Sequence, residues 1–248
     1  MLAEGYFGEM RSVLKKIEET QIAVINEAAA MIVESVTNGG TWNLFDTGHM
    51  LMHEAVGRAG GLMMVTPIFV ELKATHPARF RPIPPNANRM FMDQVRDIPQ
   101  FVLSQAQLQA GDVLMIGSVS GVNVMSVEMA RLGREMGLKI IAITSVEASK
   151  QLEPRHETGL RLFNFADIVL DNCAPYGDAL VEVAALDGQR ICPASGIATS
   201  YLNWAVQASV VEKLTERGLR PSAYLSNHLP GAGEFNAQAR KNYNARGY

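Results

Sequence analysis

Hydroxyl side chains and glycines gather at the point where an apolar run of the chain gives way to a helical pattern. The run ends at Ile116, and the small and polar stretch "GSVSG" (117–121) follows it before the helical periodicity begins. A helix amino terminus presents free N–H groups and a partial positive charge, which together hold an anion. The same residues can also form a tight turn with a helix cap, and a short motif does not separate the two. The candidate anion-binding residues are Ser118, Ser120, Gly121 and Asn123.

Two further polar loops follow apolar runs elsewhere in the chain. They are "FDTGHM" (45–50) and "TSVEAS" (144–149), and the second adds the hydroxyls of Thr144 and Ser145. In open α/β sheets, ligands bind outside the carboxyl ends of the strands. Because the polar loops would all meet at one edge of such a sheet, the pattern favours a phosphate-like ligand there.

The elements that must position these loops alternate between strands and helices. Several of the runs are apolar on both faces, as strands buried in a parallel sheet are. Parallel strands need crossover helices, so the alternation predicts a doubly wound α/β sandwich. Strands are expected at 41–46, 61–68, 112–118, 139–145 and 167–172. Helices are expected at 8–37, 49–58, 87–109, 123–137, 155–164 and 196–217.

Two segments stand outside this alternation. Residues 73–86 hold four prolines and are expected to form a loop or an extended excursion. The polar tail at 222–248 is expected to wrap over the domain or to reach a partner subunit. A length of 248 residues suits one large domain with such appendages.

Composition and charge narrow the class of protein. Hydrophobic residues make up 48% of the chain and charged residues 19%, as in a soluble globular protein. With a net charge of −3, the chain lacks the excess of basic residues that is typical of proteins that bind nucleic acid or anionic membranes. No secretory leader or bilayer-spanning run is recognisable, and Cys173 and Cys192 lack the spacing of a metal or redox motif. We therefore expect a cytoplasmic protein that binds neither nucleic acid nor membrane.

The loop "GSVSGVN", followed by "TS" after the next strand, resembles the S-x-S-G-x-[ST/N] phosphate cradle of sugar isomerase (SIS) domains. The segments "FDTGHM…HEAVGRAGGL", "RHETGLRLFNFADIVLDN", "YGDA" and "GAGEFN" are similar to a bacterial, phosphoheptose-isomerase-like SIS family of about this length. The resemblance covers essentially the whole chain, which implies a single SIS domain over 1–248. It also implies a flavodoxin-like, three-layer α/β/α sandwich with a five-stranded parallel sheet. The residues that would hold the phosphate are Ser118, Ser120, Gly121, Asn123, Thr144 and Ser145.

The resemblance implies that the chain binds a phosphorylated sugar and isomerises it between aldose and ketose through an enediol. Glu54 is the candidate base, because "HEAVGR" is similar to the "EELTGR" segment that carries a catalytic glutamate in phosphoheptose isomerases. An ion pair with Arg58 at helical spacing is the structural alternative. His49 is the first candidate for the assisting acid, ahead of the other histidines. Weaker candidates for contacts to the sugar are Thr47, Asp46, His156 and Asp178.

The chain departs from the family pattern in ways that keep other functions open. Asp46 and Met50 stand where "FGTGHS" usually has a glycine and a serine, and a carboxylate repels a phosphate. The last helix lacks the histidine that phosphoheptose isomerases use on their last helix. This absence disfavours heptose isomerisation by the same catalytic residues. The alternatives are lyase chemistry like that of the N-acetylmuramic acid 6-phosphate etherase, and a non-catalytic sugar-phosphate sensor. A homodimer or homotetramer is expected, with no metal or other cofactor.

Overall fold

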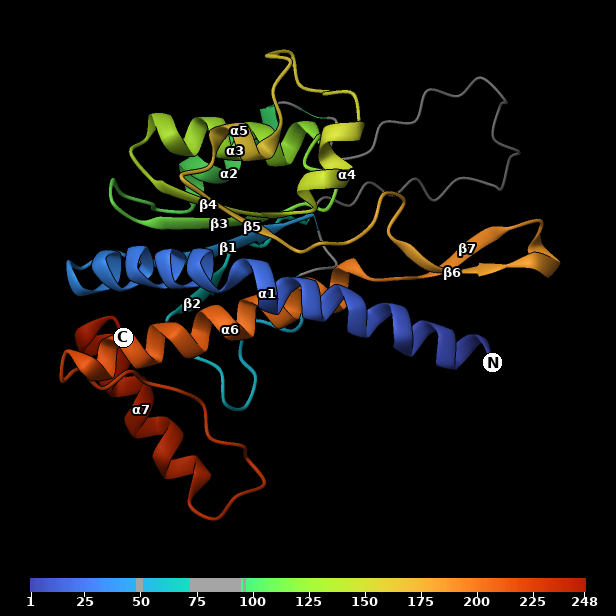
Figure 1. Cartoon of the computed structure of the whole chain (residues 1–248). Helices are drawn as coiled ribbons and strands as arrows, with labels where there is room; N and C mark the ends of the chain where they lie inside the picture. The colour runs from blue at the N-terminus through green and yellow to red at the C-terminus, as the bar shows by residue number, and fades with distance from the viewer. Residues whose placement is uncertain (48–50, 72–94, 96) are drawn as a thin grey trace, which may run out of the picture.

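A five-stranded parallel sheet forms the centre of the molecule, with its strands in the order β2-β1-β3-β4-β5 (Figure 1). The computed structural model describes residues 1–47, 51–71, 95 and 97–248. The strands are β1 (Trp42–Asp46), β2 (Val65–Pro67), β3 (Val113–Gly117), β4 (Lys139–Thr144) and β5 (Ile168–Asp171). Each lies within an expected strand, although β2 occupies only three residues of the run at 61–68.

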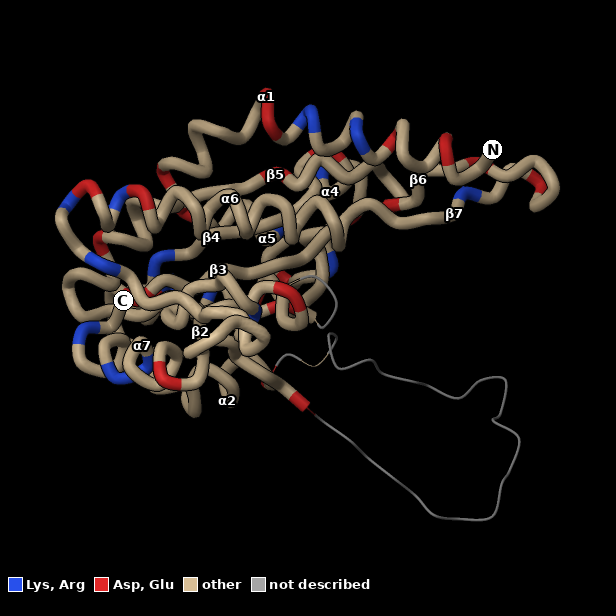
Figure 2. Tube along the Cα trace, turned by 90° about the horizontal axis from the view of Figure 1, so that it is seen from below, with Lys and Arg blue, Asp and Glu red and all other residues tan. Residues whose placement is uncertain are grey.

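Helices cover both faces of this sheet, which makes the molecule the expected three-layer α/β/α sandwich (Figure 1). Along one face α1 (Leu2–Thr37) packs against α6 (Ser195–Glu216). The other face carries α2 (Asp97–Gln105), α3 (Val124–Glu135) and α5 (Leu162–Phe165), while α4 (Val146–Gln151) follows β4. Acidic and basic residues are interspersed along α1 (Figure 2). No helix in the described ranges combines the length and the apolar character needed to cross a membrane.

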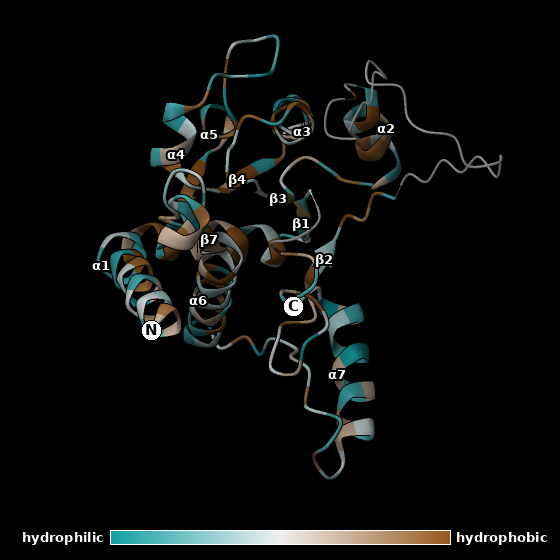
Figure 3. Cartoon of the chain, turned by 90° about the vertical axis from the view of Figure 1, so that its right-hand side faces the viewer, coloured by the Kyte–Doolittle hydropathy of each residue, from teal (hydrophilic) through white to brown (hydrophobic). Residues whose placement is uncertain are grey.

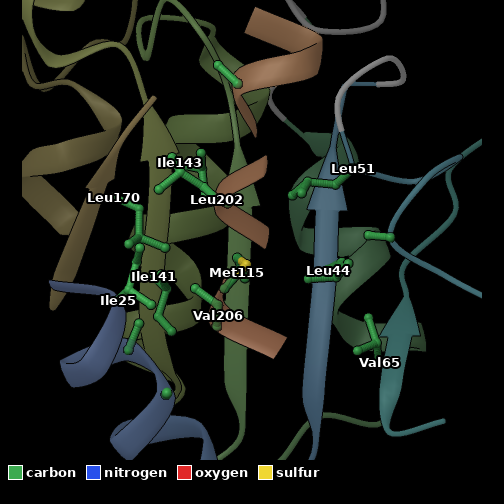
Figure 4. Close-up of a cluster of buried hydrophobic side chains, with 14 of the residues drawn as sticks. Ile25, Leu44, Leu51, Val65, Met115, Ile141, Ile143, Leu170, Leu202 and Val206 are labelled. Carbon is green, nitrogen blue, oxygen red and sulfur yellow. The ribbon is translucent and has the colours of Figure 1, made fainter. Parts of the chain in front are cut away.

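Side chains of the central strands alternate between two hydrophobic cores. On β3, Val113 and Met115 join the core under α1 and α6, whereas Leu114 and Ile116 join the core under α3. This alternation follows from the two-residue period of a strand. Because both faces are buried, the strand is apolar throughout, and the parallel sheet could be predicted from the sequence. Figure 4 shows the first core, in which the labelled side chains include Ile25 of α1, Val206 of α6 and Ile141 of β4.

The register of the sheet brings the carboxyl ends of its central strands to one edge. Asp46 at the end of β1 pairs with Gly117 at the end of β3. Gly117 pairs in turn with Ile143, and Thr144 at the end of β4 pairs with Asp171. The polar loops that follow β1, β3 and β4 therefore leave the sheet side by side, as expected.

The helix expected at 49–58 is wrong for residues 51–58, which form turns and bends. One helical turn does close, because the Ala55 N–H donates to the Leu51 carbonyl at 2.9 Å. Gly57 then adopts a φ of +67°, a left-handed conformation that stops a helix. Glu54 is consequently carried on a turn instead of a helix.

The helix expected at 155–164 is also wrong over most of its length, since only α5 is helical there. Residues 152–161 form an irregular loop that is closed by its own side chains. The Arg161 guanidinium donates to the Ser149 carbonyl at 2.9 Å and to the Leu152 carbonyl at 2.7 Å. The Leu162 N–H donates to the Gly121 carbonyl at 2.8 Å, which ties the end of this loop to the β3–α3 loop.

Two features of the structure were not expected from the sequence. Strands β6 (Ala179–Val183) and β7 (Gln189–Pro193) form an antiparallel hairpin around the 3₁₀ helix η2 (Ala184–Leu186), and β6 contacts α1. The tail forms α7 (Ala232–Arg246), which projects from the sandwich and is largely hydrophilic (Figure 3). Without an apolar stripe, α7 gives no helical signal in the sequence. The proline-rich segment 73–86 and the first part of the helix expected at 87–109 lie outside the described residues.

Candidate functional site

The loop between β3 and α3 turns tightly at the carboxyl edge of the sheet. Gly121 has a φ of +61°, and a Cβ atom on it would lie 2.8 Å from Ser149 Oγ and 2.9 Å from Thr144 Oγ1. Side chains do not pack this closely, so the loop requires glycine at this position. The Ser118 hydroxyl accepts a hydrogen bond from the Gly121 N–H at 3.3 Å, which closes the turn.

Three of the expected phosphate-binding residues line a cavity of about 380 Å³ in front of this loop, namely Ser118, Ser120 and Asn123. The Ser120 oxygen accepts from the Val122 N–H at 3.5 Å, and the Ser118 oxygen is bound within the loop as described. Backbone donors thus orient both hydroxyl oxygens. A hydroxyl group held in this way can donate its proton to an anion in the cavity.

Asn123 stands immediately before α3, whose amino terminus faces the same loop. Its backbone is extended, and within the described chain its side chain makes no capping hydrogen bond to the helix. The first turn of α3 contains no acidic residue, so no carboxylate there offsets the positive end of the helix dipole. The first-turn N–H groups of a helix lack intrahelical partners and favour an anion.

Thr144 and Ser145 lie behind the loop and are absent from the described lining of the cavity. The Thr144 hydroxyl donates to the Val119 carbonyl at 3.0 Å, and the Ser145 hydroxyl donates to the Ala174 carbonyl at 2.6 Å. Ser145 also caps α4 by accepting from the Ala148 N–H at 3.3 Å. Both residues are fully buried, so in this structure they brace the loop from within.

A second and larger cavity, of about 800 Å³, adjoins the first. His53, Glu54 and Asp178 line it together with the first turns of α6, and Asp178 also lines the 380 Å³ cavity. A third cavity of about 180 Å³ contains Asp46, Thr47 and His53 in its lining. It shares Thr47 with the first cavity and His53 with the second. The expected base Glu54 therefore lines a cavity that adjoins the one lined by the β3–α3 loop, with Asp178 common to both.

The carboxylate of Glu54 forms the ion pair that was the structural alternative to a catalytic role. Arg58 Nε lies 3.6 Å from Glu54 Oε2, and the Glu54 side chain is 44% exposed. Exposed pairs of this kind contribute at most about 1 kcal/mol, so Arg58 does not immobilise the carboxylate. Glu54 can turn toward the cavity that it lines.

Asp46, which replaces a glycine of the family pattern, is bound by the backbone of the loop that follows it. Its carboxylate accepts hydrogen bonds from the N–H groups of Leu51 and Met52, the latter at 3.2 Å. Asp46 is buried and lines the cavity of about 180 Å³, not the one that Ser118 and Ser120 line. It therefore positions the turn that carries His53 and Glu54.

Asp178 lies at the wall between the two larger cavities and holds the start of α6. Its carboxylate accepts hydrogen bonds from the Ala194 N–H at 3.1 Å and from the Ser195 N–H at 2.8 Å. It also accepts a hydrogen bond from the Ser195 hydroxyl at 2.7 Å. The Asp178 carboxylate thus binds the first residues of α6, and it lines both cavities.

His156, an expected sugar contact, lies elsewhere and lines none of the cavities just described. Its side chain is 2% exposed, with Nε2 at 2.8 Å from Glu128 Oε2 and Nδ1 at 2.8 Å from Thr158 Oγ1. Hydrogen bonds from Arg131 and His156 hold the pKa of Glu128 below its usual value. His156 thereby joins the loop 152–161 to α3. The candidate acid His49 lies outside the described residues.

The larger cavity is also lined by side chains that were not predicted from the sequence as site residues. Ile197, Tyr201 and Trp204 of α6 line it. They recur every three or four residues and so share one face of the helix. That spacing is visible in "IATSYLNW", but it is equally typical of a buried core face, and only tertiary structure distinguishes the two.

The described residues contain no group of three or more His, Cys, Asp or Glu side chains placed to hold a metal ion. Cys173 and Cys192 are free thiols, and burial raises the pKa of Cys173.

The fold and the β3–α3 loop define an α/β protein with a candidate anion-binding site at the carboxyl edge of its parallel sheet. Known protein families include one that matches this chain. Residues 5–145 match the SIS domain family, so the chain belongs to that family. It resembles UPF0309 protein BH0227 of Halalkalibacterium halodurans, at 30% identity over 98% of this chain and 94% of the relative. UPF0309 protein BH3325 of the same bacterium is 33% identical over 93% of this chain and 93% of its own length.

Solved structures show the same fold at lower identity. The phosphoheptose isomerase GmhA from Neisseria gonorrhoeae superposes with a TM-score of 0.51 at 15% identity, over 86% of this chain and 97% of that one. A phosphoheptose isomerase from Francisella tularensis gives a TM-score of 0.50 at 13% identity, over 85% of this chain and 96% of that one. At these identities the likeness concerns the fold alone.

Proposed function

We propose that the protein binds a phosphorylated sugar and isomerises it between aldose and ketose through an enediol. One observation supports this proposal above the others. The cavity lined by Ser118 and Ser120 shares Asp178 with the cavity lined by Glu54. A phosphate held at the β3–α3 loop would leave the sugar carbons pointing along that shared wall toward the Glu54 carboxylate.

In this proposal the phosphate is bound by oriented donors that already exist without ligand. Ser118, Ser120 and Asn123 contribute side chains, and the first turn of α3 contributes its N–H groups. Thr144 and Ser145 do not contact the phosphate in this proposal. Their hydroxyl groups donate to backbone carbonyls and so stabilise the loop and its surroundings. Because the loop is fixed beforehand, little conformational entropy is lost when the anion binds.

Glu54 is the proposed base. Its carboxylate would take the proton from the carbon beside the carbonyl group and return it to the former carbonyl carbon, so that the sugar keeps all its atoms. A positioned base of this kind contributes roughly 10²–10⁴ in rate. His49 is the proposed acid that moves the accompanying proton between the two oxygens. Among the described histidines, His53 lines the cavity with Glu54.

A binding screen and an exchange assay test this proposal together. Aldose, ketose and amino-sugar phosphates are screened beside their unphosphorylated forms by thermal shift, with Ser120→Ala as the binding variant. A ligand at 100 times its dissociation constant adds about 2.7 kcal/mol of stability, which such a screen detects. We expect only phosphorylated sugars to stabilise the wild type, and Ser120→Ala to lose that response.

Turnover of the ligands that bind is followed by proton NMR in deuterium oxide. We expect exchange at the carbon beside the carbonyl, with Glu54→Gln slower by roughly 10²–10⁴-fold. Glu34→Gln is the matched control, because Glu34 forms a similar exposed ion pair with Arg217 at 3.7 Å. Binding without exchange would favour a sugar-phosphate sensor, and release of a substituent would favour a lyase. Stabilisation by unphosphorylated sugars alone would contradict the proposed phosphate site.

We also propose that the protein acts in the cytoplasm as a homodimer or homotetramer. The support for assembly comes from α1, which exposes large apolar side chains at Leu2, Phe7 and Ile22. Phe7 is 56% exposed and Ile22 is 62% exposed in the single chain. A contact with a second chain would remove these exposed apolar side chains from water, which is favourable.

A further inference from the structure

The 800 Å³ cavity offers more room than the sugar part of a simple sugar phosphate requires. Cavities of roughly 300–1,000 Å³ enclose most of a drug-sized ligand. The 380 Å³ cavity at the β3–α3 loop already reaches that range, and the larger cavity extends beyond it. A ligand that fills both is therefore larger than a phosphorylated monosaccharide.

The far wall of this cavity is apolar and open to solvent in the single chain. Ile197 is 48% exposed and Tyr201 is 39% exposed, and Trp204 lies one helical turn further along the same face. Pro193 of β7 adds a further apolar side chain. Apolar side chains gathered in a concave surface indicate a ligand that removes them from water.

The two aromatic rings are held in place before any ligand binds. The Tyr201 hydroxyl donates to the Glu18 carboxylate of α1 at 2.6 Å. The Trp204 ring packs against Gly61, where an added Cβ atom would lie 3.3 Å from the ring. Rings fixed in this way lose little entropy on binding, so their surface is available for a specific contact.

The serine side chains of this cavity are engaged within the protein. The Ser195 hydroxyl donates to Asp178 at 2.7 Å, and the Ser200 hydroxyl donates to the Gly196 carbonyl at 2.9 Å. A second sugar ring packed against the apolar side chains of α6 would lose water from its hydroxyl groups and would find these serine hydroxyls already engaged, which costs free energy. An apolar group carries no such cost.

We infer that the ligand is a sugar phosphate with an apolar acyl or aryl substituent, which packs against Ile197, Tyr201 and Trp204. The inference rests on the proposed function, because a phosphate at the β3–α3 loop sets the direction in which the substituent points. The substituent is inferred to be apolar because the side chains that it would contact are apolar.

Calorimetric titration with N-acetylglucosamine 6-phosphate and with its phenyl analogue, N-benzoylglucosamine 6-phosphate, tests the inference, and both compounds keep the anomeric carbon free. We expect the phenyl compound to bind about tenfold or more tightly, since burying an aromatic ring contributes at least this much. Ile197→Gln should remove most of that gain. Leu186→Gln should leave it unchanged, because Leu186 has the same 48% exposure but lies in η2, outside the cavity lining. Ser120→Ala should weaken both phosphates alike.

The outcomes separate this inference from the proposed function. Equal affinity for the two phosphates would overturn the inference and leave the phosphate site standing. Failure of both phosphates to bind the wild type would overturn the proposed function and the inference with it. Ile197→Gln could instead change the oligomeric state, measured as the mass of the assembly by light scattering, and leave the preference for the phenyl compound unchanged. In that case this face of α6 would be a subunit contact and the inference would fall.

Discussion

Gly121 is the residue on which the shape of the β3–α3 loop depends most directly. We expect Gly121→Ala to abolish sugar-phosphate binding and to lower the free energy of unfolding. A left-handed conformation alone costs a non-glycine residue about 1–2 kcal/mol, and here the new Cβ would also displace Ser149 and Thr144. Urea denaturation and calorimetric titration measure the two effects.

Gly159 provides the matched control for this substitution. Its φ is +69°, close to that of Gly121, but nothing lies within 4 Å of an added Cβ. The free energy of unfolding of Gly159→Ala should therefore fall only by the cost of the left-handed backbone conformation. This variant should still bind ligand. Equal losses in the two variants would show that the close packing around Gly121 is unimportant.

Asp46 is expected to act on catalysis by positioning Glu54. Asp46→Ala leaves the buried N–H groups of Leu51 and Met52 without their carboxylate acceptor, which costs about 1–3 kcal/mol per group. We expect kcat to fall while the affinity for inorganic phosphate is kept. Asp46→Asn retains an acceptor oxygen and should recover most of kcat. A loss of phosphate affinity equal to the loss of kcat would place Asp46 in the phosphate site instead.

The sequence indicated which polar residues gather at the carboxyl edge of the sheet but not the direction of every side chain. Ser118, Ser120 and Asn123 line a cavity, whereas Thr144 and Ser145, which have the same chemistry, turn to the Val119 and Ala174 carbonyls. Those acceptors belong to other loops, and no local pattern reveals them. Donor type could be predicted from sequence, and orientation required the tertiary partners.

Among the elements, the strands of the sheet were predictable and the shorter connections were not. A strand buried on both faces consists of apolar residues alone, which is a strong signal. The turn at 51–58 depends on Asp46 as an acceptor and on the left-handed Gly57, and both compete with a helical pattern. The hairpin β6–β7 is stabilised in part by its contact with α1, which is remote in sequence.

The contact between the loop 152–161 and α3 should make the stability of the protein sensitive to acid. Hydrogen bonds, chiefly from Arg131 and also from His156, lower the pKa of Glu128 in the folded protein, against the opposing effect of burial. A carboxyl group with a lowered pKa stabilises the fold above its ordinary pKa, and this contribution is lost as the pH falls through the lowered value. Glu128→Gln should reduce stability at neutral pH and weaken its dependence on pH in acid.

Denaturation midpoints measured from pH 7 down to about pH 3 check this expectation. Glu147→Gln is the control, since Glu147 forms an exposed ion pair with Lys16 at 3.5 Å. Its acid profile should match that of the wild type. A Glu128→Gln profile parallel to the wild type would show that this carboxyl group does not contribute to the acid response.

At the scale of the whole molecule, the exposed apolar residues of α1 predict self-association. The double variant Phe7→Ser, Ile22→Ser should shift the mass measured by light scattering toward that of one chain. Phe101→Ser is the control, because Phe101 is 66% exposed but belongs to α2, on the opposite face of the sheet. A wild-type mass of one chain, or a shift caused equally by both variants, would count against assembly through α1.

The arrangement of the loops along one edge of the sheet also bears on how such a protein can diverge. The two hydrophobic cores are built largely from strands and from the helices that cover them, whereas β1 and the loops after β1 and β3 supply most of the polar side chains that line the 180 Å³ and 380 Å³ cavities. Many substitutions in those loops leave the cores intact and so cost little folding free energy. New ligand preferences can therefore accumulate on an unchanged framework, with Gly121 among the loop positions least able to vary.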